Sequence, residues 1–191
     1  MDVQTPSLFV GYRVDARDVL EEVSGAFADF ARENGAAGLE TRVVGTSLWG
    51  HVVGREVQAI YRDLLAHVRR TGRSVVFPYR CDAPGRRRYL EMRMRPAARE
   101  AVEFESKLLR EVPRASVEWL EPERQTEPDL LVVCAWCRRF DIGAWVEAEE
   151  AIGLLGLFDQ RRFPAMSHGI CDACKATAVA ALGSAPGPGA I

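Results

Sequence analysis

The spacing of hydrophobic residues along the chain changes from a helical period to a strand period near residue 73. Over residues 55–71 they recur every three to four positions and Gly72 follows, which predicts one amphipathic helix. The hydrophobic face of this helix is expected to comprise Val57, Ile60, Tyr61, Leu64, Leu65 and Val68. The stretches SVVFPY, YLEMRMR and AVEFESKLL then alternate with a period of two. Three such strands with short connections predict an antiparallel meander that has one buried and one solvated face.

The alternation also predicts which side chains of the meander face the core. The expected core positions are Val75, Phe77, Tyr79, Leu90, Met92, Met94, Val102, Phe104 and Leu108. The charged residues between them are expected on the solvated face. Pro78 interrupts the first of these strands and cannot donate a backbone hydrogen bond, so this strand is expected at a sheet edge or at a bulge.

The flanking segments complete the expected organisation of the chain. SLFVGYRVD reads as a short strand, the segment up to Gly35 runs into a helix, and VVGTSLWGHVVG reads as a loop with a short helical turn. Residues 113–130 are rich in Pro and Glu, which predicts a linker, and the tail at 183–191 is expected to be disordered. We therefore expect one domain at 7–112 and a small second module at 131–182.

The second module contains the main candidate for chemistry, two CxxC pairs formed by Cys134, Cys137, Cys171 and Cys174. A CxxC turn lets two thiolates converge on one ion, and two turns complete the tetrahedral set that structural Zn²⁺ prefers. The long spacing requires folded structure between the pairs, and RRFDIGAWVE predicts a hairpin while WVEAEEAIGLLGLF predicts a helix. KATAVAAL predicts a further helix whose first turn holds the second pair. A cysteine turn (knuckle), a hairpin and a helix whose first turn carries ligands are the parts of a treble clef. The sequence therefore predicts a treble-clef-like zinc module.

Several alternatives remain open for these residues. His168, three positions before Cys171, either replaces one cysteine as a ligand or supports the site from outside the ligand set. The pairs could also be redox-active thiols, although a thioredoxin-like CxxC belongs to a βαβ context that the sequence does not suggest. A closed four-thiolate site leaves no open coordination position, so metal catalysis is not expected.

Other candidates carry weaker signals. Cys81 is expected to end a strand, with a reactive thiol as the alternative, and His51 and His67 are expected to be ordinary histidines rather than haem ligands. The run of Arg86, Arg87 and Arg88 reads as a solvated turn, with an anion or partner contact as the alternative. No phosphate-binding loop, nucleophile elbow or HExxH sequence occurs, and no carboxylate pair has a context that marks acid–base catalysis. The chain is therefore expected not to be an enzyme.

Composition limits the class of protein. The chain has 191 residues with 48% hydrophobic and 27% charged residues and a formal net charge of -2, which is typical of a globular protein without a polyanionic partner. The N-terminus does not resemble a signal peptide and no hydrophobic run reaches membrane-spanning length, so a cytoplasmic location and no membrane association are expected.

Residues 7–112 resemble a PAS domain in the order of their elements: two strands, short helices, a longer helix and three long antiparallel strands. The segments behind the resemblance are VDARDVLEEVSGAFADFARENG, VVGTSLW and the meander, with FPYRCDAPGRRRYLEMRMRP similar to a subgroup of bacterial PAS-like proteins. The resemblance implies an α+β fold with a PAS-like antiparallel sheet and flanking helices, a small ligand or protein partner, and a homodimer.

The second module resembles a bacterial C-terminal module of the form CxWCkr…W…vEea…l…HGiCpxC, which follows PAS or receiver domains in signalling proteins. The matching residues are Cys134, Trp136, Cys137, Arg138, Trp145, Glu147, Glu149, His168, Gly169, Cys171 and Cys174. The chain departs from the pattern in CDAC, where the module has Pro after the first cysteine of this pair. This departure does not change any of the expected ligand residues.

Together these observations predict a non-enzymatic signalling or regulatory protein, in which a PAS-like sensing or interaction domain is joined to a structural zinc module. The alternative is a zinc-dependent, nucleic-acid-binding transcriptional regulator, because Arg138, Arg139, Arg161 and Arg162 flank the cysteines. The acidic residues of the same module argue against a basic face, so nucleic acid is not the expected partner. A thiol redox sensor is a third possibility.

Overall fold

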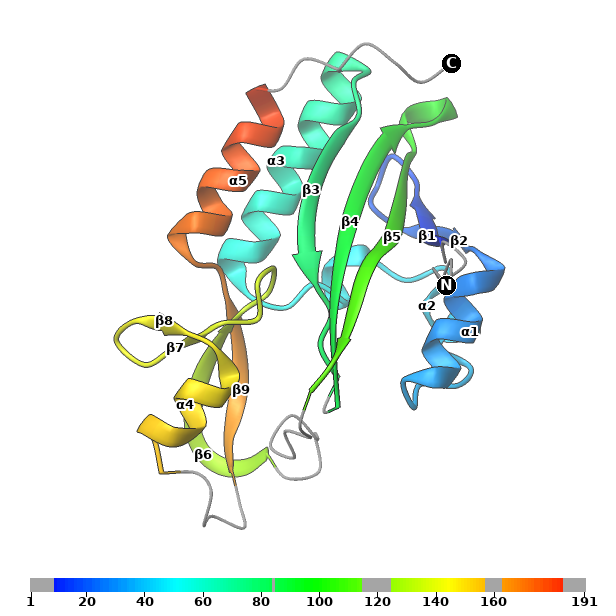
Figure 1. Cartoon of the computed structure of the whole chain (residues 1–191). Coiled ribbons are helices and arrows are strands. Elements are labelled where there is room, and N and C mark those ends of the chain that lie inside the picture. Colours follow the sequence, from blue (N-terminus) through cyan, green and yellow to red (C-terminus); the bar gives the residue numbers. More distant parts are fainter. Residues whose placement is uncertain (1–8, 84, 115–124, 157–162, 184–191) are drawn as a thin grey trace, which may run out of the picture.

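A computed structural model describes residues 9–83, 85–114, 125–156 and 163–183 of the chain. They form a mixed α/β structure with two sheets and five α-helices within the described residues (Figure 1). We call residues 9–114 the sheet region and residues 125–183 the cysteine region. In the part of the chain covered by these ranges, no helix combines the length and hydrophobicity needed to cross a membrane.

The sheet region is built on a five-stranded antiparallel sheet in the order β2-β1-β5-β4-β3. Its strands are β1 (Phe9–Val14), β2 (Leu20–Val23), β3 (Val75–Arg80), β4 (Arg86–Pro96) and β5 (Val102–Pro113). The predicted meander is confirmed, since β3 pairs with β4 and β4 with β5. Strand β3 lies at the edge of the sheet, which is the position predicted from its proline.

The period-two pattern predicted the buried face of the meander well. Phe77 and Met94 are fully buried, and the other buried positions on this face are Val75, Leu90, Met92, Val102 and Phe104. Tyr79 and Leu108 are half-buried, and Tyr79 donates a hydrogen bond from its hydroxyl to Ser106 at 2.8 Å. Ser106 occupies an inward position that the hydrophobic pattern could not identify, because its side chain is polar.

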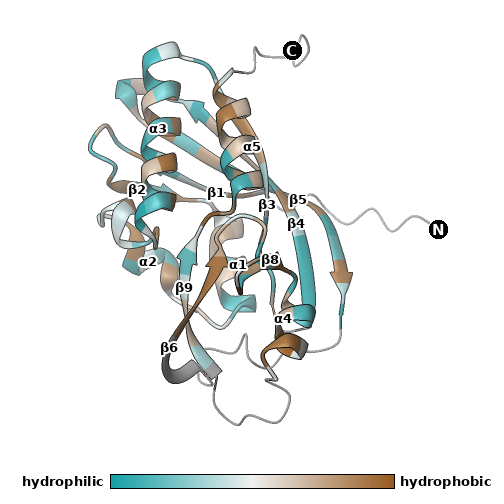
Figure 2. Cartoon of the chain, turned by 90° about the vertical axis from the view of Figure 1, so that its left-hand side faces the viewer, coloured by the Kyte–Doolittle hydropathy of each residue, from teal (hydrophilic) through white to brown (hydrophobic). Residues whose placement is uncertain are grey.

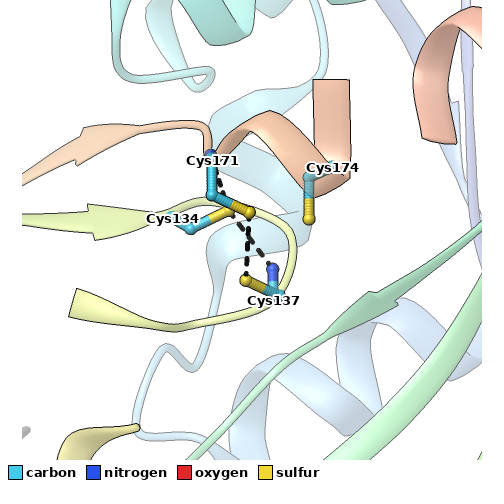
Figure 3. Close-up of side chains that lie close together, drawn as sticks. All are labelled: Cys134, Cys137, Cys171 and Cys174. Carbon is cyan, nitrogen blue, oxygen red and sulfur yellow. Dashed lines mark hydrogen bonds between the residues drawn. The ribbon is translucent and has the colours of Figure 1, made fainter. Parts of the chain in front are cut away.

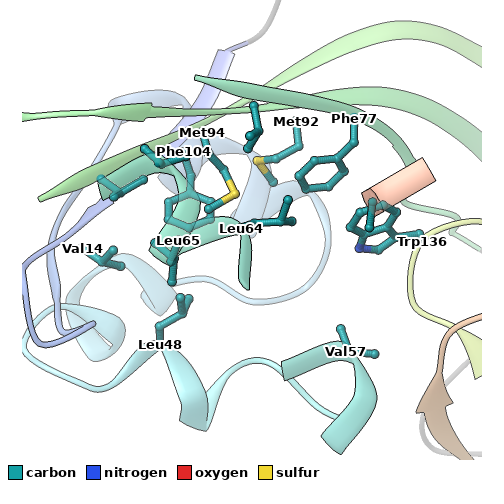
Figure 4. Close-up of a cluster of buried hydrophobic side chains, with 14 of the residues drawn as sticks. Val14, Leu48, Val57, Leu64, Leu65, Phe77, Met92, Met94, Phe104 and Trp136 are labelled. Carbon is teal, nitrogen blue, oxygen red and sulfur yellow. The ribbon is translucent and has the colours of Figure 1, made fainter. Parts of the chain in front are cut away.

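Three helices accompany the five-stranded sheet: α1 (Gly25–Glu33), α2 (Leu39–Val43) and α3 (Arg55–Thr71). Helix α1 begins after Ser24, whose side chain accepts a hydrogen bond from a backbone N–H of the first turn. Helix α3 ends at Gly72, which has a φ of 65°, as the sequence predicted. Its buried residues are Val57, Leu64, Leu65 and Val68. Figure 4 shows several of these side chains meeting those of the sheet.

The cysteine region contains a second sheet in the order β8-β7-β6-β9. Strand β6 (Gln125–Cys134) is followed by the predicted hairpin, formed by β7 (Phe140–Asp141) and β8 (Trp145–Val146) around Gly143. Strand β6 begins inside the predicted linker at 113–130, of which residues 115–124 lie outside the described part. Figure 2 shows β6 as a mainly hydrophobic strand, and its residues Leu131 and Val133 are buried.

Helix α4 (Ala148–Leu154), strand β9 (Phe163–Gly169) and helix α5 (Asp172–Gly183) complete the chain. The helices were predicted, and α5 includes Gly183, the first residue of the predicted disordered tail, whose remainder at 184–191 lies outside the described residues. Strand β9 was not predicted. It runs parallel to β6, so β6, α4 and β9 form a crossover near the cysteines, which the sequence pattern did not predict.

The two regions share one hydrophobic core. The main cluster of buried side chains includes Val14, Leu64, Phe77 and Phe104 of the sheet region, and it continues into Cys134, Trp136, Ile170, Cys171 and Ala178 of the cysteine region. Helix α5 contacts both α3 and β3 (Figure 1). The division predicted between residues 112 and 131 therefore does not coincide with a boundary in side-chain packing.

Candidate metal centre

Two separate turns position the four cysteines. Cys134 ends β6, and the chain folds back at once, because the backbone N–H of Arg138 donates to the carbonyl of Cys134 at 3.0 Å. Arg138 has a φ of 62°, which allows this tight turn. We call the turn at residues 134–138 the knuckle. Cys171 immediately precedes α5 and Cys174 lies in its first turn. Ala135 N–H donates to the carbonyl of Gly169 at 2.9 Å, so the knuckle is attached to the segment that leads into the second pair.

The four sulfur atoms lie within 4.8 Å of one another. Figure 3 shows the side chains converging from the knuckle and from the start of α5. The Sγ atoms of Cys137 and Cys171 are 3.6 Å apart. Zn–S bonds of about 2.3 Å in a tetrahedron place sulfur atoms about 3.8 Å apart, so the spacing fits one tetrahedral ion. All five cysteines of the chain are free thiols rather than disulfides. The four predicted site cysteines could therefore hold a metal ion together.

The surroundings of Cys134 favour a thiolate at that position. The thiols of Cys137 and Cys174 lower its pKa by hydrogen bonding, and the backbone N–H groups of Cys137 and Cys171 add to this effect from 3.5 and 3.4 Å. The same hydrogen bonds raise the pKa of Cys174. The bond to Cys134 has the largest effect and the bond to Cys137 the next largest. One thiolate is thus stabilised by its neighbours, and a divalent cation bound among the four sulfur atoms would let all four thiols lose their protons.

His168 lies in β9 beside Val133 of β6. The group of side chains that could share an ion, among the residues described, comprises the four cysteines and does not include His168. Burial lowers the pKa of its imidazole, and the charge of Arg138 lowers it further. Its Nδ1 is buried without a hydrogen-bond partner. The geometry therefore fits a set of four sulfur ligands, and a supporting role for His168 stays a prediction.

The other residues of the cysteine motif hold the site in place. Trp136, between the first two cysteines, is buried and stacks on Phe77 of β3 with ring centroids 4.1 Å apart. At Gly169, a Cβ atom would come within 2.9 Å of Val132 and 3.8 Å of the Trp145 ring. Trp136, Trp145 and Gly169 stand out in the cysteine motif, but their partners are not visible in the sequence, because these contacts join distant parts of the chain.

The acidic residues of the motif form ion pairs with the sheet region. Glu147 accepts two hydrogen bonds from the buried guanidinium of Arg80, at 2.9 and 3.1 Å, and Arg80 also pairs with Asp82. Glu149 accepts two from Arg87, at 2.9 and 3.0 Å. The prediction of a solvated turn at residues 86–88 is therefore wrong for Arg87, and also for Arg88, which is buried and bonded to Glu111 and Asn34. These arginines serve contacts within the protein.

The remaining candidates lie outside the four-cysteine group. Burial raises the pKa of Cys81, which disfavours its reactive thiolate form, although Arg88 and Arg138 partly offset the effect. His51 is exposed and its ring shares a hydrogen bond with the Thr46 hydroxyl at 2.7 Å. His67 is half-buried in α3. Neither histidine belongs to a metal-binding group within the described residues.

Helix α5 and the knuckle thus bring together four cysteines that span 40 positions of the sequence. Cys134 and Cys171 are buried and shielded from most of the solvent. Such an arrangement is typical of a closed site with a structural role. No protein-family model matches the chain, and no curated protein sequence matches it either.

Proposed function

We propose that Cys134, Cys137, Cys171 and Cys174 bind one Zn²⁺ ion with a structural role. The observation that carries this proposal is the approach of the four sulfur atoms to within 4.8 Å of one another. Four thiolates are a ligand set that zinc prefers, and they leave no position for a substrate. The ion would join the knuckle after β6 to the start of α5, in addition to the pairing of β6 with β9 and the packing of both segments in the shared core.

We further propose that the chain is a non-enzymatic signalling or regulatory protein, in which a PAS-like domain senses a small molecule or binds a protein partner. The order of elements in the sheet region supports this. The order is two strands, two short helices, the longer helix α3 and three antiparallel strands. This is the order that the resemblance to a PAS domain implies. A homodimer is part of the same proposal, and light scattering that gives a monomer at high micromolar concentration would contradict it.

The nucleic-acid alternative gains no support from the flanking arginines. Arg138 is half-buried within the knuckle, and burial lowers its pKa. Arg139 donates to Glu147 at 3.2 Å. Arg161 and Arg162 lie outside the described residues. Of the two described arginines, Arg138 is thus partly buried and Arg139 is exposed but paired with Glu147, whereas phosphate contacts require several free cations on one exposed face.

Elemental analysis and native mass spectrometry of the purified chain test the zinc proposal directly. We expect close to one zinc per chain in the wild type and in Cys81→Ser, which is the matched control because it removes a cysteine outside the four-sulfur group. Cys171→Ser is expected to lose the ion. Untreated wild-type protein with well under half an equivalent of any metal would contradict the proposal.

A further inference from the structure

The first cysteine pair is attached to the core of the sheet region through the residue between its ligands. The Trp136 ring lies nearly parallel to that of Phe77, at an interplanar angle of 6°. The ring of Tyr61 in α3 is nearly perpendicular to both rings, with its centroid 6.1 Å from that of Phe77 and 6.4 Å from that of Trp136. Trp136 is 2% exposed and Phe77 is 0% exposed. The knuckle therefore closes one end of the hydrophobic core of the sheet region.

The same knuckle contacts the open edge of the five-stranded sheet at Arg80, the last residue of β3. Strand β3 has a neighbour on one side only, β4. On its other side the backbone N–H of Arg80 donates to the carbonyl of Trp136 at 2.6 Å. An unpaired strand edge is a template for pairing with another chain, so the knuckle covers a surface with intrinsic binding capacity.

The second cysteine pair is packed against the sheet region independently. Ile170 and Cys171 belong to the shared core, and α5 lies along α3 and β3. Gly54, which precedes α3, approaches the chain just before this pair so closely that a Cβ atom would lie 2.3 Å from the carbonyl oxygen of His168. Both ligand-bearing segments thus contact the sheet region, and the four-sulfur site lies where they meet.

We propose that metal occupancy of the four-cysteine site controls access to the β3 edge and to the Phe77 face of the core. This inference rests on the proposed zinc binding. With the ion bound, four metal–sulfur bonds fix the knuckle against the start of α5 and hold Trp136 on Phe77. When the ion is removed, the knuckle loses this fixation and moves away from β3. The surface that becomes accessible is the edge strand at Arg80 together with the hydrophobic ring of Phe77, which suits a protein segment that adds as an extended strand.

Hydrogen exchange of the full-length protein, with zinc bound and after chelation, tests the inference. The Arg80 amide reports on the contact with Trp136, and the amides of the β1–β5 ladder, at Val10 to Val14, serve as the internal control because they lie on the far side of the sheet. We expect zinc removal to accelerate exchange at Arg80 by about tenfold or more, while the β1 amides change by less than about twofold. Returning Zn²⁺ should restore the slow exchange.

Three results would overturn the inference, and they are distinct. If zinc leaves and the Arg80 amide stays protected, the coupling is wrong while the metal site stands. If the β1 amides accelerate as much as Arg80, the ion holds the whole fold rather than this edge. If elemental analysis of the same samples finds no metal, the zinc proposal itself fails and the inference fails with it.

Tryptophan fluorescence supplies a second measurement that does not depend on amide exchange. Chelation should move the emission of Trp136 to longer wavelength, because its buried ring becomes hydrated. Trp136→Phe should remove most of the zinc-dependent change. Trp49→Phe is the matched control and should retain it, since Trp49 lies in the short helix η1 (Leu48–Gly50) and stacks under Arg62 rather than on the knuckle. A zinc-dependent change that survives Trp136→Phe in full would contradict the inference.

Discussion

The two regions of this protein differ in how they obtain a core. The sheet region buries Phe77, Phe104, Leu64, Leu65 and Met94 completely or almost completely. The separate cluster of the cysteine region has five buried residues, Leu131, Val133, Phe140, Ala148 and Ala151, and two of them are alanines. So small a core cannot offset the conformational entropy of folding by itself. The cysteine region therefore depends on contacts with its neighbour and, we propose, on a metal ion.

The comparison predicts that removing a ligand has the largest effect, and that it falls mainly on the cysteine region. Cys134→Ser and Cys174→Ala should each abolish zinc retention and expose residues 131–182 to protease. Metal binding supplies about 10–16 kcal/mol in small zinc domains, far more than the local core provides. Limited proteolysis with mass spectrometry measures the effect, and Cys81→Ser is the control. Protection of both regions in Cys174→Ala would show that the cysteine region folds without the complete site.

The second prediction concerns the contact by which the cysteine region enters the core that it shares with the sheet region. Trp136→Ala leaves all four cysteines in place but removes a buried ring from Phe77, and such truncations cost about 3–5 kcal/mol. Denaturant titration should show this loss in the unfolding of the sheet region as well. Trp136→Phe keeps an aromatic partner and should cost less. If only the cysteine region were destabilised, the two regions would be energetically separate despite their shared core.

The third prediction tests the close contact between the backbone at Gly54 of the sheet region and that at His168 of the cysteine region. Gly54 has a φ of 95° and no room for a Cβ atom beside His168, whereas Gly72, with a φ of 65°, has open space around it. Gly72→Ala should lower the free energy of unfolding by about 1–2 kcal/mol, which is the penalty for placing a side chain in the left-handed conformation. Gly54→Ala should cost more, because the backbone must also move apart, and it should weaken zinc retention. Equal losses of unfolding free energy in the two variants would contradict this prediction.

The smallest expected effect belongs to the ion pairs between the regions. Burial raises the pKa of Glu147, but hydrogen bonding and the positive charge of Arg80 outweigh it, so the pKa is lowered overall. A lowered carboxyl pKa stabilises the fold above the pKa of the unfolded chain, near 4.3, and this contribution is lost as pH falls through the folded value. Glu147→Gln should therefore lower the free energy of unfolding by roughly 0.5–1 kcal/mol at pH 7, and this loss should shrink as the pH falls through the lowered folded-state pKa.

Glu149→Gln is the matched control for this last prediction. The Glu149 side chain is 49% exposed, against 32% for Glu147, and its partner Arg87 keeps other acidic neighbours. Replacement of Glu149 should change the unfolding free energy at pH 7 less than replacement of Glu147 does. Denaturant titrations of both variants across the acidic range provide the measurement, and a pH-independent loss in Glu147→Gln would show that its contact is not electrostatic.

The sequence by itself determined the elements whose patterns are local. The period-two alternation identified β3, β4 and β5 and their buried residues, the three-to-four spacing identified α3, and the two CxxC pairs identified the metal-site candidates. These signals are readable because the period of side-chain exposure follows directly from strand and helix geometry, and because two thiols in one turn are neighbours in any fold.

Only the tertiary structure decided how the two regions meet. Strand β9 has no clear alternation, and its pairing with β6 depends on a crossover. Trp136 and Phe77 are distant in sequence, as are Glu147 and Arg80, which are 67 positions apart. Nothing in the local pattern distinguishes a motif tryptophan that packs within its own module from one that closes a neighbouring core. The difference lies in which surfaces become buried together, and the free energy of that burial belongs to the whole fold.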